Sequence, residues 1–275
     1  MTARSQEGLN GRASGKNIAA IHRYWYPLAS LSRRELKKRY ATTMLGVSWT
    51  VLQPLALLAI YVFVFGFVLR SGRAPEDARH FVLYILTGML PFLAIAEGLQ
   101  RACTALREDR ALLDRADFPA QVVPAARVFS ASVGEAVGLA LLVVLAPAFG
   151  MPLTGWILML PVLVAMRVMI TCGLAWIVST LALFVSDLAE VLSFMLTAWL
   201  FLTPIFYTAN DVPEFLRWTT TMNPLHHLVD AYRSVLLKGE APFPEGAFVV
   251  AWAAAIAAAG WWFFRKTLDR GKDLL

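Results

Sequence analysis

Residues 156–206 read WILMLPVLVAMRVMITCGLAWIVSTLALFVSDLAEVLSFMLTAWLFLTPIF. Only Ser186 and Asp187 divide this stretch into one apolar run over 156–185 and a second over 188–206. A helix needs about 20 mainly apolar residues to cross a hydrocarbon core about 30 Å thick, and each run reaches or nearly reaches that length. The stretch therefore predicts two membrane-spanning helices joined by a tight hairpin.

The rest of the chain contains four more apolar runs. Overall, 58% of the 275 residues are hydrophobic and 16% are charged, whereas a soluble domain is about 45–50% apolar and about 25% charged. This composition excludes a water-soluble enzyme. It predicts an all-α integral membrane protein, with one transmembrane domain over residues 23–275 after a flexible polar tail over 1–22. The six predicted spans cover residues 45–69, 81–99, 122–149, 156–185, 188–206 and 248–264.

Positive charge is distributed unevenly among the segments that join these spans. Most of the 25 Lys and Arg residues lie before the first span, in the segment 101–121 or after the last span. Because cytoplasmic segments of membrane proteins are enriched in Lys and Arg, both termini are expected on the cytoplasmic side. The net charge of +6 thus indicates membrane orientation and not a nucleic-acid partner.

A short amphipathic helix is predicted over residues 27–41, before the first span. Leu28, Leu31 and Tyr40 fall on its apolar arc, and the charged Glu35 interrupts that arc. Such a helix is expected to lie at the membrane interface without crossing it. The alternative is a basic segment that simply precedes the first span. The basic residues of this interface helix are Arg33, Arg34, Lys37, Lys38 and Arg39.

The outer segment over residues 207–240 is not an ordinary hydrophilic loop. Asn223 and Pro224 form a typical helix start, with an N-cap residue followed by proline. The helix that they open, over residues 225–237, would be only about 20 Å long and too short to span. We expect a re-entrant pair of segments that forms an outer gate. Its candidate residues are Pro213, Asn223, Pro224, His226 and His227.

The sequence contains no phosphate-binding loop. Residues 11–17, GRASGKN, imitate one, but the spacing is one residue short and Asn17 stands where Ser or Thr would hold magnesium. The HExxH metal pattern, cysteines at metal spacing and the serine nucleophile elbow are also missing. We expect no catalytic residue, no metal site and no cofactor bound by this chain. Uphill transport would need an ion gradient or a separate energy-supplying subunit.

Three ionisable residues within the predicted spans, Glu97, Glu135 and Arg167, are candidates for ion coupling. The depths of Glu135 and Arg167 differ by about 9 Å at 1.5 Å per residue, a gap that the two side chains can bridge. An ion pair, separate snorkelling of each side chain and contact with substrate are all compatible with the sequence. No chain of acids typical of a proton relay is visible, so ion-driven transport is the less favoured hypothesis.

The segment 101–121 is dense in charges of both signs. A short charged helix around residues 106–117 would project from the membrane, and Phe118 and Pro119 would end it. Such an element suits docking of a partner protein, although an inert charged connector is equally compatible with it. The candidate docking residues are Arg107, Glu108, Asp109, Arg110, Asp114, Phe118 and Pro119.

Five patterns in the chain resemble those of one known family. Read together, they are similar to the membrane-spanning permease subunits of type-2 ABC exporters, in particular those that export lipid-linked polysaccharides such as O-antigen, capsule or teichoic acid. The patterns occur in the family's order and spread over nearly the whole chain after residue 20. They are RRELKKRYATTMLGVSWTVLQPL (33–55), LTGMLPF (86–92), LLDRADFPAQVVP (112–124), TPIFY (203–207) and MNPLHHLVDAYRSVLLKG (222–239).

This resemblance implies the type-2 ABC exporter fold in a bacterial inner membrane. Such permeases form homodimers and bind two copies of a separate ATPase subunit, which carries ATP and magnesium. The helix over residues 106–117 would be the coupling helix on that ATPase, and Asp187 in the inner hairpin would contact it as well. Ser186 departs from the family, which more often has Arg-Asp at this position, and this difference puts the hairpin contact in doubt.

The resemblance also implies a channel for a lipid-linked polymer between two protomers, together with membrane lipid around them. Aromatic rings suit such a channel because sugar C–H groups pack flat on them, although each ring could instead face lipid or the bundle core. The candidates are Trp49, Tyr61, Tyr84, Trp199, Phe206 and Tyr207. A permease for a small hydrophobic compound, an ion-coupled transporter and a membrane glycosyltransferase are the alternatives.

Overall fold

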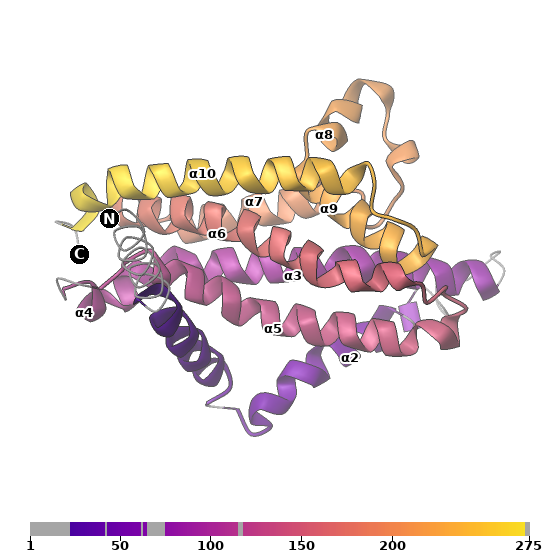
Figure 1. Ribbon diagram of the computed structural model, residues 1–275, viewed down its shortest axis with the longest axis horizontal. Helices are drawn as coiled ribbons and strands as arrows, with labels where there is room; N and C mark the ends of the chain where they lie inside the picture. The colour runs from indigo at the N-terminus through magenta and orange to yellow at the C-terminus, as the bar shows by residue number, and fades with distance from the viewer. Residues whose placement is uncertain (1–22, 42, 62, 65–74, 115–117, 273–275) are drawn as a thin grey trace, which may run out of the picture.

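The computed structural model describes residues 23–41, 43–61, 63–64, 75–114 and 118–272, and every regular element in these ranges is helical. Four long helices run side by side along the long axis of the molecule (Figure 1). They are α3 (Pro75–Glu108), α5 (Val122–Leu145), α6 (Leu160–Phe184) and α10 (Glu245–Lys272).

These four helices contain the segments long and apolar enough to cross a membrane in the described part of the chain. The segments are His80–Glu108, Val122–Leu145, Gly155–Phe184 and Glu245–Leu268. They correspond to the predicted spans over 81–99, 122–149, 156–185 and 248–264. The chain is therefore an all-helical, multi-pass membrane protein. The short 3-10 helix Gly155–Met159 precedes α6 within the third of these segments.

The other two predicted spans contain shorter helices. The helix α7 (Leu188–Leu202) ends before Pro204, because the residue before a proline avoids the helical conformation and Thr203 is extended. The helix α2 (Trp49–Tyr61) starts after the 3-10 turn Gly46–Ser48, and Gly46 has a positive φ of 53°. Residues 65–69 of that predicted span lie outside the described residues.

Several helix ends differ from the predicted boundaries, among them those of α5 and α3. The helix α5 stops at Leu145 and not at residue 149, since Pro147 cannot continue the helical hydrogen bonds and a 3-10 turn, Ala146–Phe149, follows. At the other end of the bundle, α3 continues to Glu108. Residues 101–105 are thus helix and not loop, and residues 106–108, which were predicted to begin a separate short helix, belong to α3.

The closest helix crossing joins α6 and α10. A Cβ atom on Gly173 would lie 2.5 Å from the carbonyl oxygen of Ile256, and one on Gly260 would overlap the backbone of Gly173. Small residues let helix backbones approach closely in lipid, where no hydrophobic force drives helices together. These two glycines therefore determine how α10 docks on the bundle.

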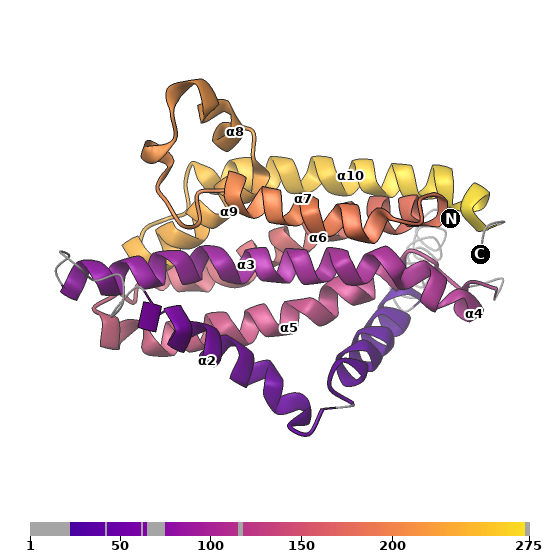
Figure 2. The ribbon, with the colours of Figure 1, turned by 180° about the vertical axis from the view of Figure 1, so that it is seen from behind.

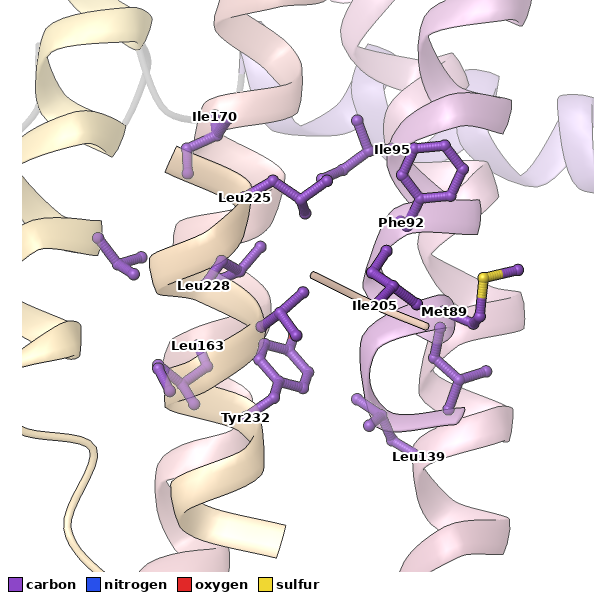
Figure 3. Packing of buried hydrophobic residues seen from close by; sticks show 14 of the residues in the cluster. Met89, Phe92, Ile95, Leu139, Leu163, Ile170, Ile205, Leu225, Leu228 and Tyr232 are labelled. Carbon is purple, nitrogen blue, oxygen red and sulfur yellow. The ribbon is translucent and has the colours of Figure 1, made fainter. Parts of the chain in front are cut away.

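The outer segment contains only short helical pieces, which begin with two 3-10 turns, Ala209–Asp211 and Glu214–Leu216. The helices α8 (Arg217–Thr221) and α9 (Pro224–Arg233) are followed by a π-helical turn, Ser234–Lys238, which Gly239 ends with φ 66°. Figure 3 shows Leu225, Leu228 and Tyr232 of α9 facing α3, with Ile205 between the two helices. The helix predicted over 225–237 is thus present in two parts, and its apolar side belongs to the core.

Candidate functional site

Glu35 attaches the helix over residues 23–40 to the bundle. This side chain is 3% exposed and forms ion pairs with Arg127 of α5 and with Arg101 of α3, the latter at 3.4 Å. The predicted apolar arc is present beside it, since Leu31 and Tyr40 are buried. The acid that seemed to interrupt this arc is in fact its ionic anchor. Helix 23–40 therefore packs against protein on the side that carries Glu35.

Asp109 extends the same network beyond the end of α3. Its two carboxylate oxygens lie 2.5 Å from Arg34 and 2.9 Å from Arg127, and only 8% of its side chain is exposed. We call Arg34, Glu35, Arg101, Asp109 and Arg127 the Arg127 cluster. Arg127 lies at its centre with 3% of its side chain exposed. No role had been predicted for this residue, although a lone Arg near the start of a predicted span signals a buried partner.

The structure divides the predicted coupling helix over residues 106–117. Arg107 and Glu108 belong to the last turn of α3, and the next helix, α4, contains only Arg110–Leu113. Residues 115–117 lie outside the described residues. The carboxylate of Asp109 is buried in the Arg127 cluster, where it pairs with Arg34 and Arg127. Arg110 and Asp114 remain exposed, and Phe118 and Pro119 are half-buried.

The hairpin between α6 and α7 lies beside the end of α3. Arg107 donates a hydrogen bond to the carbonyl oxygen of Ala182, near the end of α6. Asp187 is exposed in the three-residue connection, where its carboxylate accepts from Ser186 at 3.0 Å. The last turn of α3 and the end of α6, which leads into the exposed hairpin, are thus close neighbours at one end of the bundle. The predicted tight hairpin is confirmed.

Asn223 organises the start of α9, as its sequence context predicted. Its Oδ1 accepts from the backbone N–H of Leu225 at 3.0 Å and from Trp199 Nε1 at 2.9 Å, while its Nδ2 donates to Thr203 Oγ1 at 2.8 Å. Pro224 occupies the first helical position. One buried amide therefore joins α9 to the end of α7.

Arg233 supports the irregular backbone that follows α7. Its guanidinium donates to the carbonyl oxygens of Pro204, Ile205 and Tyr84 at 2.9, 3.3 and 3.4 Å, and it lies over the ring of Tyr84. Backbone carbonyls away from water need such donors. Sequence reasoning did not select Arg233. The signal available in the sequence was the proline-containing TPIF segment, which interrupts the apolar run, together with a short helix that carries a single Arg.

The two histidines of α9 differ in their surroundings. His227 is buried, with Nδ1 2.6 Å from Glu245 and Nε2 2.8 Å from the carbonyl oxygen of Thr221. Burial lowers the pKa of His226, and the nearby carboxylate of Asp230 partly opposes this shift. Pro213, another residue predicted to belong to the outer gate, is exposed in the loop before α8. His227 thus connects the outer segment to the start of α10.

Four of the six predicted channel aromatics gather near the end of α7. Tyr84 donates to the carbonyl oxygen of Tyr207 at 3.1 Å, Tyr207 donates to that of Phe201 at 2.7 Å, and Phe206 packs near Phe201. Trp199 belongs to this group through Asn223. Trp49 instead starts α2 with 37% of its surface exposed. Tyr61 ends α2, and its side chain lies outside the described residues.

The intramembrane charges are paired. Arg167 lies 2.6 Å from Glu135 and donates to Ser132 at 2.7 Å, and neither charged side chain is exposed. Tyr232 of α9 donates to the other oxygen of Glu135 at 2.9 Å. The predicted Glu135–Arg167 pair is confirmed among the alternatives, while Glu97 pairs with Arg39 at 2.6 Å. A buried polar contact therefore joins α9 to the interior of the bundle.

We predict that Arg233→Lys lowers the apparent melting temperature by several degrees. Lysine keeps the charge but cannot form the planar fork that reaches three carbonyls, and buried acceptors without partners cost about 1–3 kcal/mol each. Thermal unfolding of the detergent-solubilised protein measures this effect. Arg217→Lys, at a 55% exposed side chain, is the matched control. An unchanged melting temperature would contradict this role of Arg233.

Comparison with known protein families connects these features to a class of transporter. Residues 26–237 match the family described as ABC-2 type transporter. This range includes helix 23–40 from its fourth residue, the Arg127 cluster and all of α9. The chain belongs to the ABC-2 type transporter family. Members of this family form the membrane permease component of a transporter and are not its ATPase.

Curated relatives in this family align with most of the chain. An O-antigen export system permease protein, RfbA, of Myxococcus xanthus is 28% identical over 247 residues, which cover 86% of this chain and 93% of the relative. RfbA of Klebsiella pneumoniae is 26% identical, with 90% and 94% covered. The polysialic acid transport protein KpsM of Escherichia coli is 24% identical, with 76% and 81% covered.

Proposed function

We propose that this protein is the permease subunit of an ATP-driven exporter of lipid-linked polysaccharide. The observation that carries the proposal is the alignment, over most of both chains, with permeases that are named for O-antigen export and polysialic acid transport. Membership of the ABC-2 family supports the transport mechanism. Energy would come from a separate ATPase subunit, which would hold ATP and magnesium.

The proposed ATPase-docking face consists of α4 and the α6–α7 hairpin. Exposed charges support it: Arg110 and Asp114 flank α4, and Asp187 lies in the hairpin. The hydrogen bond from Arg107 to Ala182 joins the end of α3, which precedes α4, to the end of α6, which precedes the hairpin. Two permease copies would each bind one ATPase. The Arg127 cluster then transmits movement of this face to helix 23–40, because it joins Asp109 to Arg34 and Glu35.

The proposed topology has six crossings in the bacterial inner membrane, with both termini in the cytoplasm. The start of helix 23–40, α4 and the C-terminal end of α10 lie at the same end of the bundle, which supports it (Figure 2). The helices α2 and α7 would be the two shorter crossings of a single permease domain over residues 23–275. Helix 23–40 would lie near the interface, with Arg33, Lys37 and Lys38 exposed toward lipid phosphates.

The polymer would pass between two protomers of a homodimer and leave beside α9. The aromatic group at the end of α7, Tyr84, Trp199, Phe206 and Tyr207, would line the outer part of that route. Their polar atoms already bond to protein, so ring faces and not hydroxyls would contact sugar. The contacts of Asn223 and His227 would hold α9 as the outer gate.

The direct test is reconstitution with the cognate ATPase. The two subunits are expected to co-purify, and a lipid-linked glycan is expected to stimulate ATP hydrolysis in proteoliposomes. The undecorated lipid carrier is the control for a small hydrophobic substrate. Stimulation by the carrier alone to the same extent would contradict polysaccharide export, and failure of the ATPase to co-purify would contradict the transporter assignment.

We predict that Arg110→Glu combined with Asp114→Lys weakens ATPase binding by about tenfold or more, because both exposed charges are reversed at the proposed interface. Co-purification yield and ATPase stimulation measure the effect. Glu214→Lys, in an 87% exposed side chain of the outer segment, is the matched control. Asp109 is left unchanged, since its replacement would break the Arg127 cluster. Normal binding by the double variant would exclude α4 from the interface.

A further inference from the structure

A small pocket with both apolar and polar walls lies where helix 23–40 and α2 meet α3 and α5. Its volume is about 50 Å³. Apolar side chains such as Leu57, Leu90 and Leu93 form part of its wall. The polar residues that line it come from all four helices, and they are Arg39, Tyr40, Thr50, Gln53, Glu97 and Glu135.

Two hydroxyl groups of this pocket have no protein partner among the described residues. These are Tyr40 Oη and Thr50 Oγ1, and each residue is only 6% exposed. A helical threonine usually bonds to the carbonyl four residues earlier, as Thr87 does to Leu83 at 2.7 Å. Burial of a hydroxyl without a hydrogen bond is costly. Both groups therefore point to a ligand in the pocket.

The charged residues of the pocket make the site able to accept as well as to donate hydrogen bonds. Arg39 binds Glu97 at 2.6 Å and Gln53 at 3.1 Å, while Glu135 binds Arg167 and Tyr232. These interactions leave further lone pairs on the carboxylates and further N–H groups on Arg39 and Gln53. The matching ligand is a small neutral molecule that both donates and accepts.

We propose that this pocket binds a cluster of about three water molecules, since each buried water needs roughly 10–15 Å³ and two to four polar partners. The volume is too small for a sugar ring or an acyl chain. Binding of a cation is disfavoured because Arg39 lines the pocket and Arg167 pairs with Glu135. The waters connect helix 23–40 and α2 to α3 and α5 through bridged hydrogen bonds.

Gly134 keeps this space open. A Cβ atom on Gly134 would meet no heavy atom within 4 Å, whereas one on Gly138, a turn further along α5, would overlap Leu90. The two glycines are four residues apart, a spacing at which small residues often let helices pack closely. Only Gly138 packs closely, and Gly134 lines the pocket. A larger side chain at residue 134 would fill the site.

The sign of a stability change tests the proposal. Thr50→Val is nearly isosteric, and in a hydrated pocket it removes a hydrogen bond to water, so the apparent melting temperature is expected to fall by about 2–4 °C. In a dry pocket the same change relieves an unsatisfied hydroxyl and raises it. Thr87→Val is the matched control for loss of a buried hydroxyl. A fall similar to that of the control, which loses a known hydrogen bond, supports the proposal, and a rise or an unchanged melting temperature would overturn it.

A second measurement on the unmodified protein keeps the test independent of folding. X-ray radiolysis of bound water generates hydroxyl radicals locally and labels adjacent side chains. Tyr40 is expected to be labelled severalfold more than Tyr232, which is fully buried and whose hydroxyl is bonded to Glu135. Gly134→Leu is expected to reduce the label on Tyr40 to the level of Tyr232. Equal labelling of the two tyrosines in the unmodified protein would overturn the proposal.

Discussion

Replacement of Gly173 by leucine is expected to abolish accumulation of the folded protein. A side chain at this position of α6 meets the backbone of α10, with Ile256 O at 2.5 Å and Ile256 C at 2.7 Å. Backbone atoms cannot yield as a flexible side chain can, so the two helices must separate. In lipid, lost packing is not compensated by burial elsewhere. Size-exclusion profiles of a fluorescent fusion, extracted in mild detergent, measure the effect.

The control for this prediction is Gly155→Leu. Gly155 starts the 3-10 turn before α6, and a Cβ atom there meets nothing within 4 Å. The Gly155→Leu substitution introduces the same side chain near the same helix without touching α10. A monodisperse Gly173→Leu protein with normal yield would show that the α6–α10 crossing is not as tight as described.

Replacement of Arg127 by methionine is expected to cost about 3–5 kcal/mol, which corresponds to a fall of roughly 6–20 °C in the apparent melting temperature. The change leaves Glu35 and Asp109 buried without their shared cation. Removal of one partner of a buried ion pair is much worse than removal of both, because the remaining charge stays desolvated. Thermal unfolding of the purified permease measures the loss.

A double-mutant cycle separates the ion pair from simple packing. Adding Glu35→Met to Arg127→Met removes one uncompensated charge and is expected to recover part of the lost stability. Arg110→Met, at an exposed arginine of α4, is the matched control and is expected to change little. Additive effects of the two substitutions would show that Arg127 and Glu35 do not interact.

Hydropathy predicted the long helices because the bilayer requires apolar length, and local chemistry predicted the start of α9. Asn223 and Pro224 carry that signal within two residues, and Pro204 similarly explains where α7 stops. The end of α3 was predicted wrongly for a physical reason. Hydropathy marks where a chain leaves lipid, whereas Arg and Glu are good helix formers in water. The helix therefore continues through the charged residues to Glu108.

The partners of the buried polar groups could not be predicted in this way. Glu35 was recognised as an intruder on an apolar face, but its cations come from α3 and α5, far along the chain. The contacts of Arg233 and Tyr232 could likewise not be predicted, because their acceptors lie in distant parts of the chain. Amphipathic periodicity reports which side of a helix is buried, and it carries no information about what lies opposite.

The attachment of helix 23–40 has a consequence for the order of biogenesis. Glu35 emerges from the ribosome early, but Arg101 follows it by 66 residues and Arg127 comes later still. Until α3 and α5 have entered the membrane, this acid has only its nearest basic neighbours to balance it. Helix 23–40 can therefore complete its contacts with the bundle only after α5 has been synthesised, long after it has itself left the ribosome.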